Sequence, residues 1–360
     1  MLRKLRGDAC GEGAAAFSHG VAGKEKAVDT ARQRTLGTLE RAPRAVLLLV
    51  AAALAALSVA LLAAQEPARA SFPGANGDVA FVGLDAESST YQIFTVSPAG
   101  GTPKQLTFDD TSKESLAWSP DGRKIAFVRG GPSHRDIYTM NADGSGKVAI
   151  TSSKKRDDYD PAWSPSGRRL VFSRDVGKQP YPPDRDLFTV RSNGSNVVRL
   201  TRTEQSEDNP AWSPDGTKIA FSTYTPDGYT GYSRIHVMKA DGSEPPAALL
   251  HYNFGNVEGL GWSPDGQWLA FASVNPRGSS ITKVRADGSE EPMGLISGDS
   301  YGCFDTPDYN PSSPDWSPDG TQMVFADSCS GLVTMDADGA NVGSIYGGWV
   351  GWPSWQPLAR

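Results

Sequence analysis

The sequence predicts an all-β fold, a six-bladed β-propeller of four-stranded antiparallel blades, and three observations predict it. A Trp-Ser-Pro-Asp-Gly motif, with Ser for Asp in one copy, recurs five times at intervals of 45 to 54 residues, a period that suits a four-stranded blade. A second glycine-terminated turn follows each copy. The region after residue 70 also begins and ends with complementary halves of the motif. The motif tryptophans are Trp118, Trp163, Trp212, Trp262 and Trp316, with Trp355 in the last half-motif.

Each unit divides into four short β-prone runs separated by turns. In the Ser-Pro-Asp-Gly turn, proline fixes φ at the second position, aspartate suits the third, and glycine accepts the left-handed conformation. The second turn, for example Asp143-Gly144, is a strong hairpin signal between the third and fourth runs. We therefore interpret the motif tryptophans as anchors of the innermost strands and the repeated aspartates as turn residues.

The half-motifs predict how the ring closes. Residues 75–83 (ANGDVAFVG) match the unit from its glycine onward but have no preceding tryptophan, whereas Trp355-Gln356-Pro357 matches its start. The C-terminal segment is therefore expected to supply the innermost strand of the first blade. Closure in this way removes two exposed sheet edges.

The unit W-S-P-D-G-x-x-I-A-F, followed by I-Y-x-M-x-A-D-G-S, resembles the WD40-like PD40 repeat of TolB-type six-bladed propellers. The resemblance covers about residues 72–357. TolB is a periplasmic component of the Tol-Pal envelope system and binds partner proteins on its propeller, so the resemblance implies a protein-binding role. TolB also carries an α/β domain ahead of its propeller, and we expect none between the first blade and the export signal described next.

The N-terminal region predicts export. Residues 1–44 have no useful periodicity and are interpreted as a disordered leader. The uncharged apolar run 45–64 follows basic residues and precedes Ala68-Arg69-Ala70, which fits a signal-peptidase site. Residues 45–70 are therefore either a cleaved signal peptide or a retained transmembrane anchor, and residues 71–360, the propeller, lie outside the cytoplasm in a periplasmic, extracellular or membrane-anchored location.

The composition of residues 71–360 limits the function classes. This region contains 25 Lys and Arg against 35 Asp and Glu, a net charge of −10, which argues against nucleic-acid binding. It contains no His-Glu-x-x-His and no Cys-x-x-Cys. We therefore expect a protein that is not an enzyme and has no cofactor.

One cluster of carboxylates leaves room for a metal ion. Four aspartates should lie where the inner strands of blades three and four begin, close to the central channel, and carboxylate oxygens bind Ca²⁺. The alternative is that they cap strand ends and keep the surface soluble. The candidate ligands are Asp157, Asp158, Asp160 and Asp208.

The two faces of the propeller should differ. The tight turns all fall on one face, called here the tight-turn face. Connections between blades, and between the second and third strands of a blade, fall on the opposite, long-loop face, where loops vary and carry function. Aromatic residues of these loops suit recognition of a protein or glycan. The candidates are Tyr181, Tyr224, Tyr229, Tyr232, Tyr252, Phe254, Tyr301 and Tyr309.

Cysteines and tryptophans near the closure give two further expectations. Cys303 and Cys329 fall in loops on the same face of blade six, so a disulfide between them is geometrically reasonable in an oxidising compartment. Trp349 and Trp352 either pack the junction of the last and first blades or form a sugar platform.

The leading functional hypothesis is an exported, non-catalytic, monomeric propeller that binds an envelope or secreted protein through its long-loop face, with membrane contact limited to residues 45–64. The alternative is a carbohydrate- or Ca²⁺-binding propeller, with lyase- or hydrolase-like activity from channel carboxylates. A plugged channel with a broad aromatic surface favours the first hypothesis. An open acidic pocket favours the second.

Overall fold

The computed structural model describes most of the region that carries the repeats. The described residues are 73–130, 134–153, 155–177, 184–226, 231–250, 252–276, 278–299 and 311–358, and all belong to one compact unit, Pro67–Arg360. None of these described segments contains a helix long and apolar enough to cross a membrane. The apolar run 45–64 lies outside the described residues, so the expectation of a signal peptide or anchor stays a prediction.

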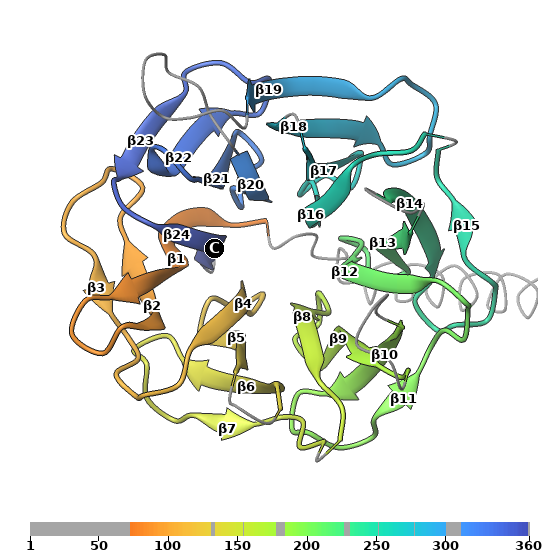
Figure 1. The fold of residues 1–360 in the computed structure, drawn as a ribbon, viewed down its shortest axis with the longest axis horizontal. Helices are drawn as coiled ribbons and strands as arrows, with labels where there is room; N and C mark the ends of the chain where they lie inside the picture. The colour runs from red at the N-terminus through yellow and green to blue at the C-terminus, as the bar shows by residue number, and fades with distance from the viewer. Residues whose placement is uncertain are drawn as a thin grey trace, which may run out of the picture. The chain divides into compact units, whose positions relative to one another are not determined.

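Six four-stranded antiparallel sheets are arranged radially around a central channel (Figure 1). Blade one consists of β24 (Val350–Leu358), β1 (Ala75–Asp85), β2 (Thr90–Val96) and β3 (Lys104–Gln105). Blade two consists of β4 (Lys113–Trp118), β5 (Lys124–Arg129), β6 (Asp136–Asn141) and β7 (Val148–Ala149). Blade three consists of β8 (Asp158–Trp163), β9 (Arg169–Asp175), β10 (Arg185–Arg191) and β11 (Val198–Arg199). The predicted fold class is confirmed.

The other three blades follow the same order from the channel outward. Blade four consists of β12 (Ser206–Trp212), β13 (Lys218–Thr225), β14 (Tyr232–Lys239) and β15 (Ala247–Ala248). Blade five consists of β16 (Asn256–Trp262), β17 (Trp268–Asn275), β18 (Gly278–Arg285) and β19 (Met293–Asp299). Blade six consists of β20 (Pro311–Trp316), β21 (Gln322–Asp327), β22 (Gly331–Asp336) and β23 (Gly343–Tyr346).

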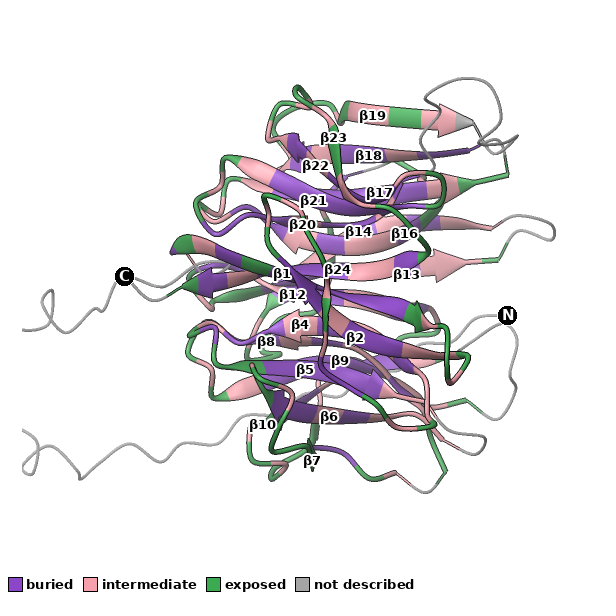
Figure 2. Ribbon diagram, turned by 90° about the vertical axis from the view of Figure 1, so that its left-hand side faces the viewer, coloured by how far each residue is buried: buried purple, intermediate pink, exposed green. Residues whose placement is uncertain are grey.

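The ring closes as the half-motifs predict. The C-terminal strand β24 pairs with β1 in antiparallel register, with Val79 opposite Trp355 and Ala80 opposite Ser354. The two ends of the described propeller therefore share one blade, and Figure 2 shows β24 and β1 lying together. At the junction with blade two, the backbone N–H of Trp118 donates a hydrogen bond to Ser354 Oγ (3.3 Å).

The hydrophobic core is a series of layers between neighbouring blades. Each motif tryptophan except Trp212 is at least 94% buried, and the second strand of every blade contributes a phenylalanine that is at most 1% exposed. Because each layer uses residues from two blades, no blade buries its apolar surface alone. The phenylalanines are Phe81, Phe127, Phe172, Phe221, Phe271 and Phe325.

The two kinds of tight turn are stabilised in different ways, the first by polar contacts and the second by a glycine. In the first, Ser119 Oγ donates to Asp121 Oδ1 (2.6 Å) and accepts from the backbone N–H of Lys124 (2.9 Å). In the second, Gly144 has φ +88°, and a Cβ there would lie 2.4 Å from the carbonyl oxygen of Leu106 in blade one. Glycine is therefore required at this turn both for its conformation and for the close approach of the neighbouring blade.

Candidate functional site

The innermost strand of every blade contains an irregularity three residues before the motif tryptophan. The pairing of each inner strand with its neighbour shifts register at this point, as in a β-bulge. The residue there has a positive φ of 40° to 62° in all six blades. These residues, called the bulge ring, are Ser115, Asp160, Asn209, Gly259, Ser313 and Trp352.

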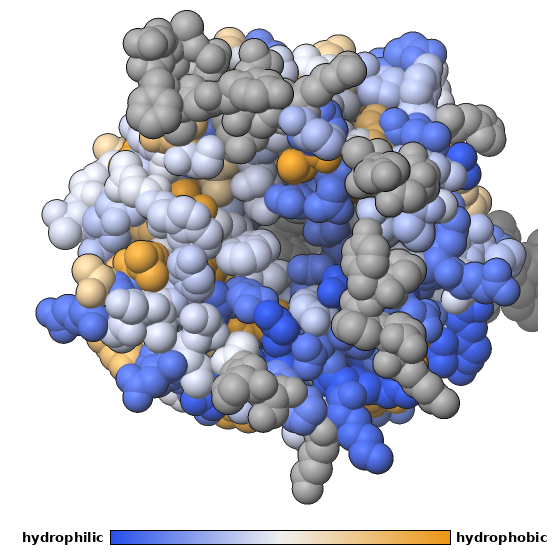
Figure 3. Space-filling view, in the orientation of Figure 1, coloured by the Kyte–Doolittle hydropathy of each residue, from blue (hydrophilic) through white to orange (hydrophobic). Residues whose placement is uncertain are grey.

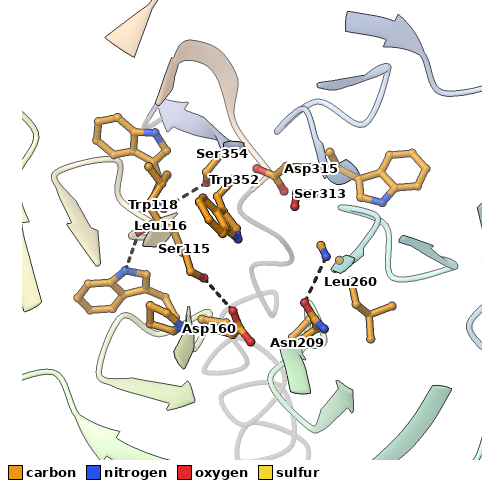
Figure 4. A pocket seen from close by; sticks show the side chains of 18 of the residues that line it. Ser115, Leu116, Trp118, Asp160, Asn209, Leu260, Ser313, Asp315, Trp352 and Ser354 are labelled. Carbon is orange, nitrogen blue, oxygen red and sulfur yellow. Dashed lines mark hydrogen bonds between the residues drawn. The ribbon is translucent and has the colours of Figure 1, made fainter. Parts of the chain in front are cut away.

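Neighbouring members of the bulge ring are linked to each other. Ser115 Oγ donates to Asp160 Oδ1 (3.0 Å), and the backbone N–H of Gly259 donates to Asn209 Oδ1 (3.3 Å). Asn209 Nδ2 also donates to the carbonyl oxygen of Val257 (2.8 Å). Figure 4 shows these side chains converging on the channel. A non-glycine residue in this conformation costs about 1–3 kcal/mol. Five of the six members of the ring are not glycine, so contacts with the surrounding structure must offset this cost at five positions.

The bulge ring separates two cavities. Toward the tight-turn face lies a cavity of about 170 Å³, lined by the motif tryptophans and by proline and leucine side chains such as Pro161 and Leu260. Toward the long-loop face lies a larger one of about 840 Å³, called here the vestibule, to which every blade except blade two contributes. Asp160, Asn209, Ser313 and Trp352 line both cavities. The channel therefore has more aromatic and aliphatic side chains on the tight-turn side of the ring and more charged ones on the long-loop side.

The vestibule opens on the long-loop face, which is the side seen in Figures 1 and 3. Figure 3 shows this face hollowed at its centre, with hydrophilic residues gathered on the side of blades three and four. The polar wall includes Asp208 and Glu258, and blade one contributes Trp349 and Trp352. The vestibule is therefore acidic on one side and aromatic on another.

Two carboxyl groups of the channel wall have strongly raised pKa values. Burial, together with the nearby charge of Asp208, raises the pKa of Asp160 to about 6. Burial also raises the pKa of Asp315 to about 6, although its carboxylate accepts hydrogen bonds from the backbone N–H of Trp355 (2.7 Å) and from Ser354. Both groups therefore exchange protons near neutral pH.

Two glutamates near the vestibule also have raised pKa values. Burial raises the pKa of Glu258, against a hydrogen bond that Asn256 Nδ2 donates to its carboxylate (3.3 Å). Burial raises the pKa of Glu207 to about 7, against hydrogen bonds from Thr203 and Thr201. The acidic wall therefore carries less negative charge at neutral pH than its residue types suggest.

Arginines that the sequence analysis did not place neutralise much of the cluster. Arg185 contacts Asp175 (2.9 Å) and Asp208 (2.7 Å), and its guanidinium lies 3.9 Å from the centre of the Tyr159 ring. Arg135 pairs with Asp157 (3.3 Å) and with Glu114 of the same blade (3.0 Å). The result is an ionic network that crosses from blade two to blade four.

The four candidate calcium ligands are not brought together as one donor set. Asp158 is fully buried and pairs with Arg174 (2.5 Å), Asp157 faces Arg135, and Asp208 faces Arg185. Of the four, Asp160 and Asp208 interact across the channel wall. In the part of the chain that the structure describes, no three His, Cys, Asp or Glu side chains are grouped as a metal site needs.

Half of the candidate aromatic residues can be placed. Tyr224 lines the vestibule. Tyr252 is 42% exposed, and the centre of its ring lies 6.4 Å from that of Phe254. The guanidinium of Arg234 lies 5.2 Å from the centre of the Tyr232 ring. The remaining candidates, Tyr181, Tyr229, Tyr301 and Tyr309, lie outside the described residues.

The tryptophans and cysteines near the closure can be placed in part. Trp349 is 48% exposed, lines the vestibule, and packs against Tyr91 of the same blade at 4.5 Å. Trp352 packs against the core layer between blades one and two. Cys329 is disulfide-bonded, but Cys303 lies outside the described residues, so their pairing stays a prediction.

The comparisons with known proteins agree with this fold. Residues 69–213 match the family model PD40, the TolB β-propeller domain. An uncharacterized protein of Agrobacterium fabrum is 29% identical over 154 residues, which are 42% of this chain and 50% of the relative, so the chain matches about half of that relative's length.

Solved structures extend the likeness in fold to about four fifths of the chain. TolB from Acinetobacter baumannii superposes with a TM-score of 0.61 at 21% identity, over 80% of this chain and 67% of that one. A chain of a nidogen/laminin complex gives a TM-score of 0.60 at 12% identity, over 78% and 98%. At such identities the likeness concerns the fold. The described residues therefore form a six-bladed β-propeller that resembles TolB in its fold, and residues 69–213 of the chain match the TolB β-propeller domain.

Proposed function

We propose that this chain is an exported, non-catalytic propeller that binds a protein partner of the cell envelope through its long-loop face, with the vestibule at the centre of the contact. The observation that supports it is the vestibule itself. A cavity of about 840 Å³ combines an exposed aromatic side chain, Trp349, with hydrogen-bonding and acidic groups. Aromatic anchors surrounded by polar groups are typical of protein-binding surfaces.

The opposite end of the channel supports the same choice of face. There the motif tryptophans, prolines and leucines line a cavity of about 170 Å³, much smaller than the vestibule and below the about 300–1,000 Å³ usual for ligand pockets. The resemblance to TolB-type propellers further supports an envelope protein as partner and an exported location.

A carbohydrate ligand is the second candidate, and the exposed Trp349 ring beside serine hydroxyls of the vestibule favours it. Calcium is less well supported, because arginines already occupy three of the four candidate carboxylates. Lyase- or hydrolase-like chemistry would require carboxylates free to act on a bound sugar. Asp160 and Glu258 are the two vestibule carboxylates with raised pKa values that such chemistry would use.

Site-specific photocrosslinking in the native cells tests the proposal. A benzophenone side chain replaces Asn256, an exposed residue lining the vestibule, and in a separate variant Asp143, an exposed residue of the tight-turn face. We expect a discrete protein adduct from position 256 and none from position 143. Adducts from position 143 alone, or sugar binding by the purified full-length chain with no adduct from position 256, would overturn it.

A further inference from the structure

The outermost strand of blade five differs from those of the other blades. β19 has seven residues, whereas β3, β7, β11 and β15 have two each and β23 has four. Propellers normally keep these outer edges short, because an exposed strand edge presents unpaired N–H and C=O groups to any extended chain. β19 therefore departs from the rule that the rest of the molecule follows.

The outer edge of β19 has no strand paired to it among the described residues. It stands last in the order β16-β17-β18-β19, and Figures 1 and 2 show it at the rim of the ring. Of its seven residues, Met293–Asp299 (MGLISGD), none is proline and the last alone, Asp299, is charged, so the usual guards of an edge strand are sparse. One guard is present, a bulge in its pairing with β18 at which Leu295 of β19 is the extra residue.

The strand is nevertheless held in place from the inside. Leu295 and Ile296 pack against the core layer between blades five and six. Blade six also approaches the strand closely, because a Cβ built on Gly339 would lie 2.9 Å from the carbonyl oxygen of Leu295. Met293 and Ser297 are exposed on the same strand. A fixed strand is a better template for pairing than a mobile one, because less conformational entropy is lost on binding.

Charge indicates what kind of segment fits. Glu290 and Glu291 are exposed just before β19, where Glu290 pairs with Arg285 (3.5 Å) and Glu291 accepts a hydrogen bond from the Tyr252 hydroxyl. The propeller region carries a net charge of −10. A second copy of the chain would bring two such acidic surfaces together, which disfavours self-pairing. A segment with basic residues beside its apolar stretch is complementary instead.

We propose that β19 is a second interaction surface, at which an extended segment of another protein with basic residues at one end adds as a fifth strand to blade five. Main-chain hydrogen bonds would supply the affinity, as in β-strand addition generally. The basic residues would lie against Glu290 and Glu291 and set the direction and register of the added strand.

Fluorescence anisotropy with the full-length chain tests this surface. The probe is the labelled peptide KKVTVTV, compared with DDVTVTV and with a KKVTVTV peptide N-methylated at alternate residues. We expect the acidic and the N-methylated peptides to bind at least tenfold more weakly than KKVTVTV, and the charge effect to shrink in 0.5 M salt. Equal binding of the N-methylated peptide would overturn the proposal.

Protein variants locate the binding on the chain. Glu290→Gln with Glu291→Gln is expected to weaken KKVTVTV binding several-fold, and Ser297→Pro to weaken it further while the melting temperature confirms folding. The matched control is Glu244→Gln, which changes the corresponding turn ahead of the short strand β15 and should leave binding unchanged. Trp349→Ala should also leave it unchanged, which separates this surface from the vestibule. Undiminished binding by the double Gln variant, or concentration-dependent dimers in sedimentation, would contradict the proposal.

Discussion

Replacing Gly259 by alanine probes the bulge ring directly. Gly259 has φ +62°, and a Cβ built on it would lie 2.3 Å from the Cα and 2.6 Å from the carbonyl carbon of Ser313 in the next blade. Both contacts are with backbone, so no side chain can rotate away. The substitution must either move β16 and β20 apart or change the backbone conformation at this point.

The expected loss of stability has two parts. An alanine in the left-handed conformation costs about 1–2 kcal/mol, and forcing a methyl group into a closely packed contact costs about 1–3 kcal/mol. Gly259→Ala is therefore expected to lower the free energy of unfolding by about 2–5 kcal/mol. Gly343→Ala is the control, because no atom lies within 4 Å of its built Cβ and its φ is not positive. There we expect a change below about 1 kcal/mol.

Equilibrium urea unfolding of the purified full-length chain, followed by tryptophan fluorescence, measures both variants. The comparison requires the same m-value as the wild type, so that the shift in midpoint reports stability alone. If Gly259→Ala unfolds at the wild-type urea concentration, or no earlier than Gly343→Ala, the close contact between neighbouring members of the bulge ring is wrong.

Two further predictions concern the polar groups of the channel. The folded-state pKa of Asp160, about 6, exceeds its unfolded value, so the folded protein binds more protons between about pH 4 and pH 6 and gains stability as the pH falls through that window. Asp160→Asn should therefore be more stable than the wild type by about 2–4 kcal/mol at pH 7, with little advantage at pH 4. Urea unfolding at both pH values checks this, and an equal advantage at both would contradict it. Ser354→Ala leaves the N–H of Trp118 without its partner, at a cost of about 1–3 kcal/mol, and should speed hydrogen exchange in β24 more than in β12; uniform protection would contradict it.

The architecture follows from the sequence because repetition makes the same local signals recur. Five copies of one turn pattern specify where five of the inner strands end, and the half-motifs at residues 75–83 and Trp355 specify the closure. Hydrophobic layers between identical units then leave few alternatives for the arrangement.

The site follows less directly, because it is made of differences between the repeats. The residue types of the bulge ring give a partial signal: asparagine, aspartate and glycine tolerate the left-handed conformation, but Trp352 does not share that tendency. Arg185 stands on the third strand of its blade, 23 residues from Asp208, so its pairing depends on how neighbouring blades meet. Acidic loops were readable from the sequence, but their partners were not.

The affinity of the crosslinked partner for wild-type and variant chains tests the role of the vestibule most directly. Trp349→Ala removes the exposed aromatic side chain of the vestibule, whereas Val148→Ala removes an equally exposed apolar side chain from the outer strand β7. Binding measured by isothermal titration should weaken at least tenfold for Trp349→Ala and remain unchanged for Val148→Ala. Unchanged affinity for Trp349→Ala, with both variants folded, would contradict the vestibule as the partner-binding site.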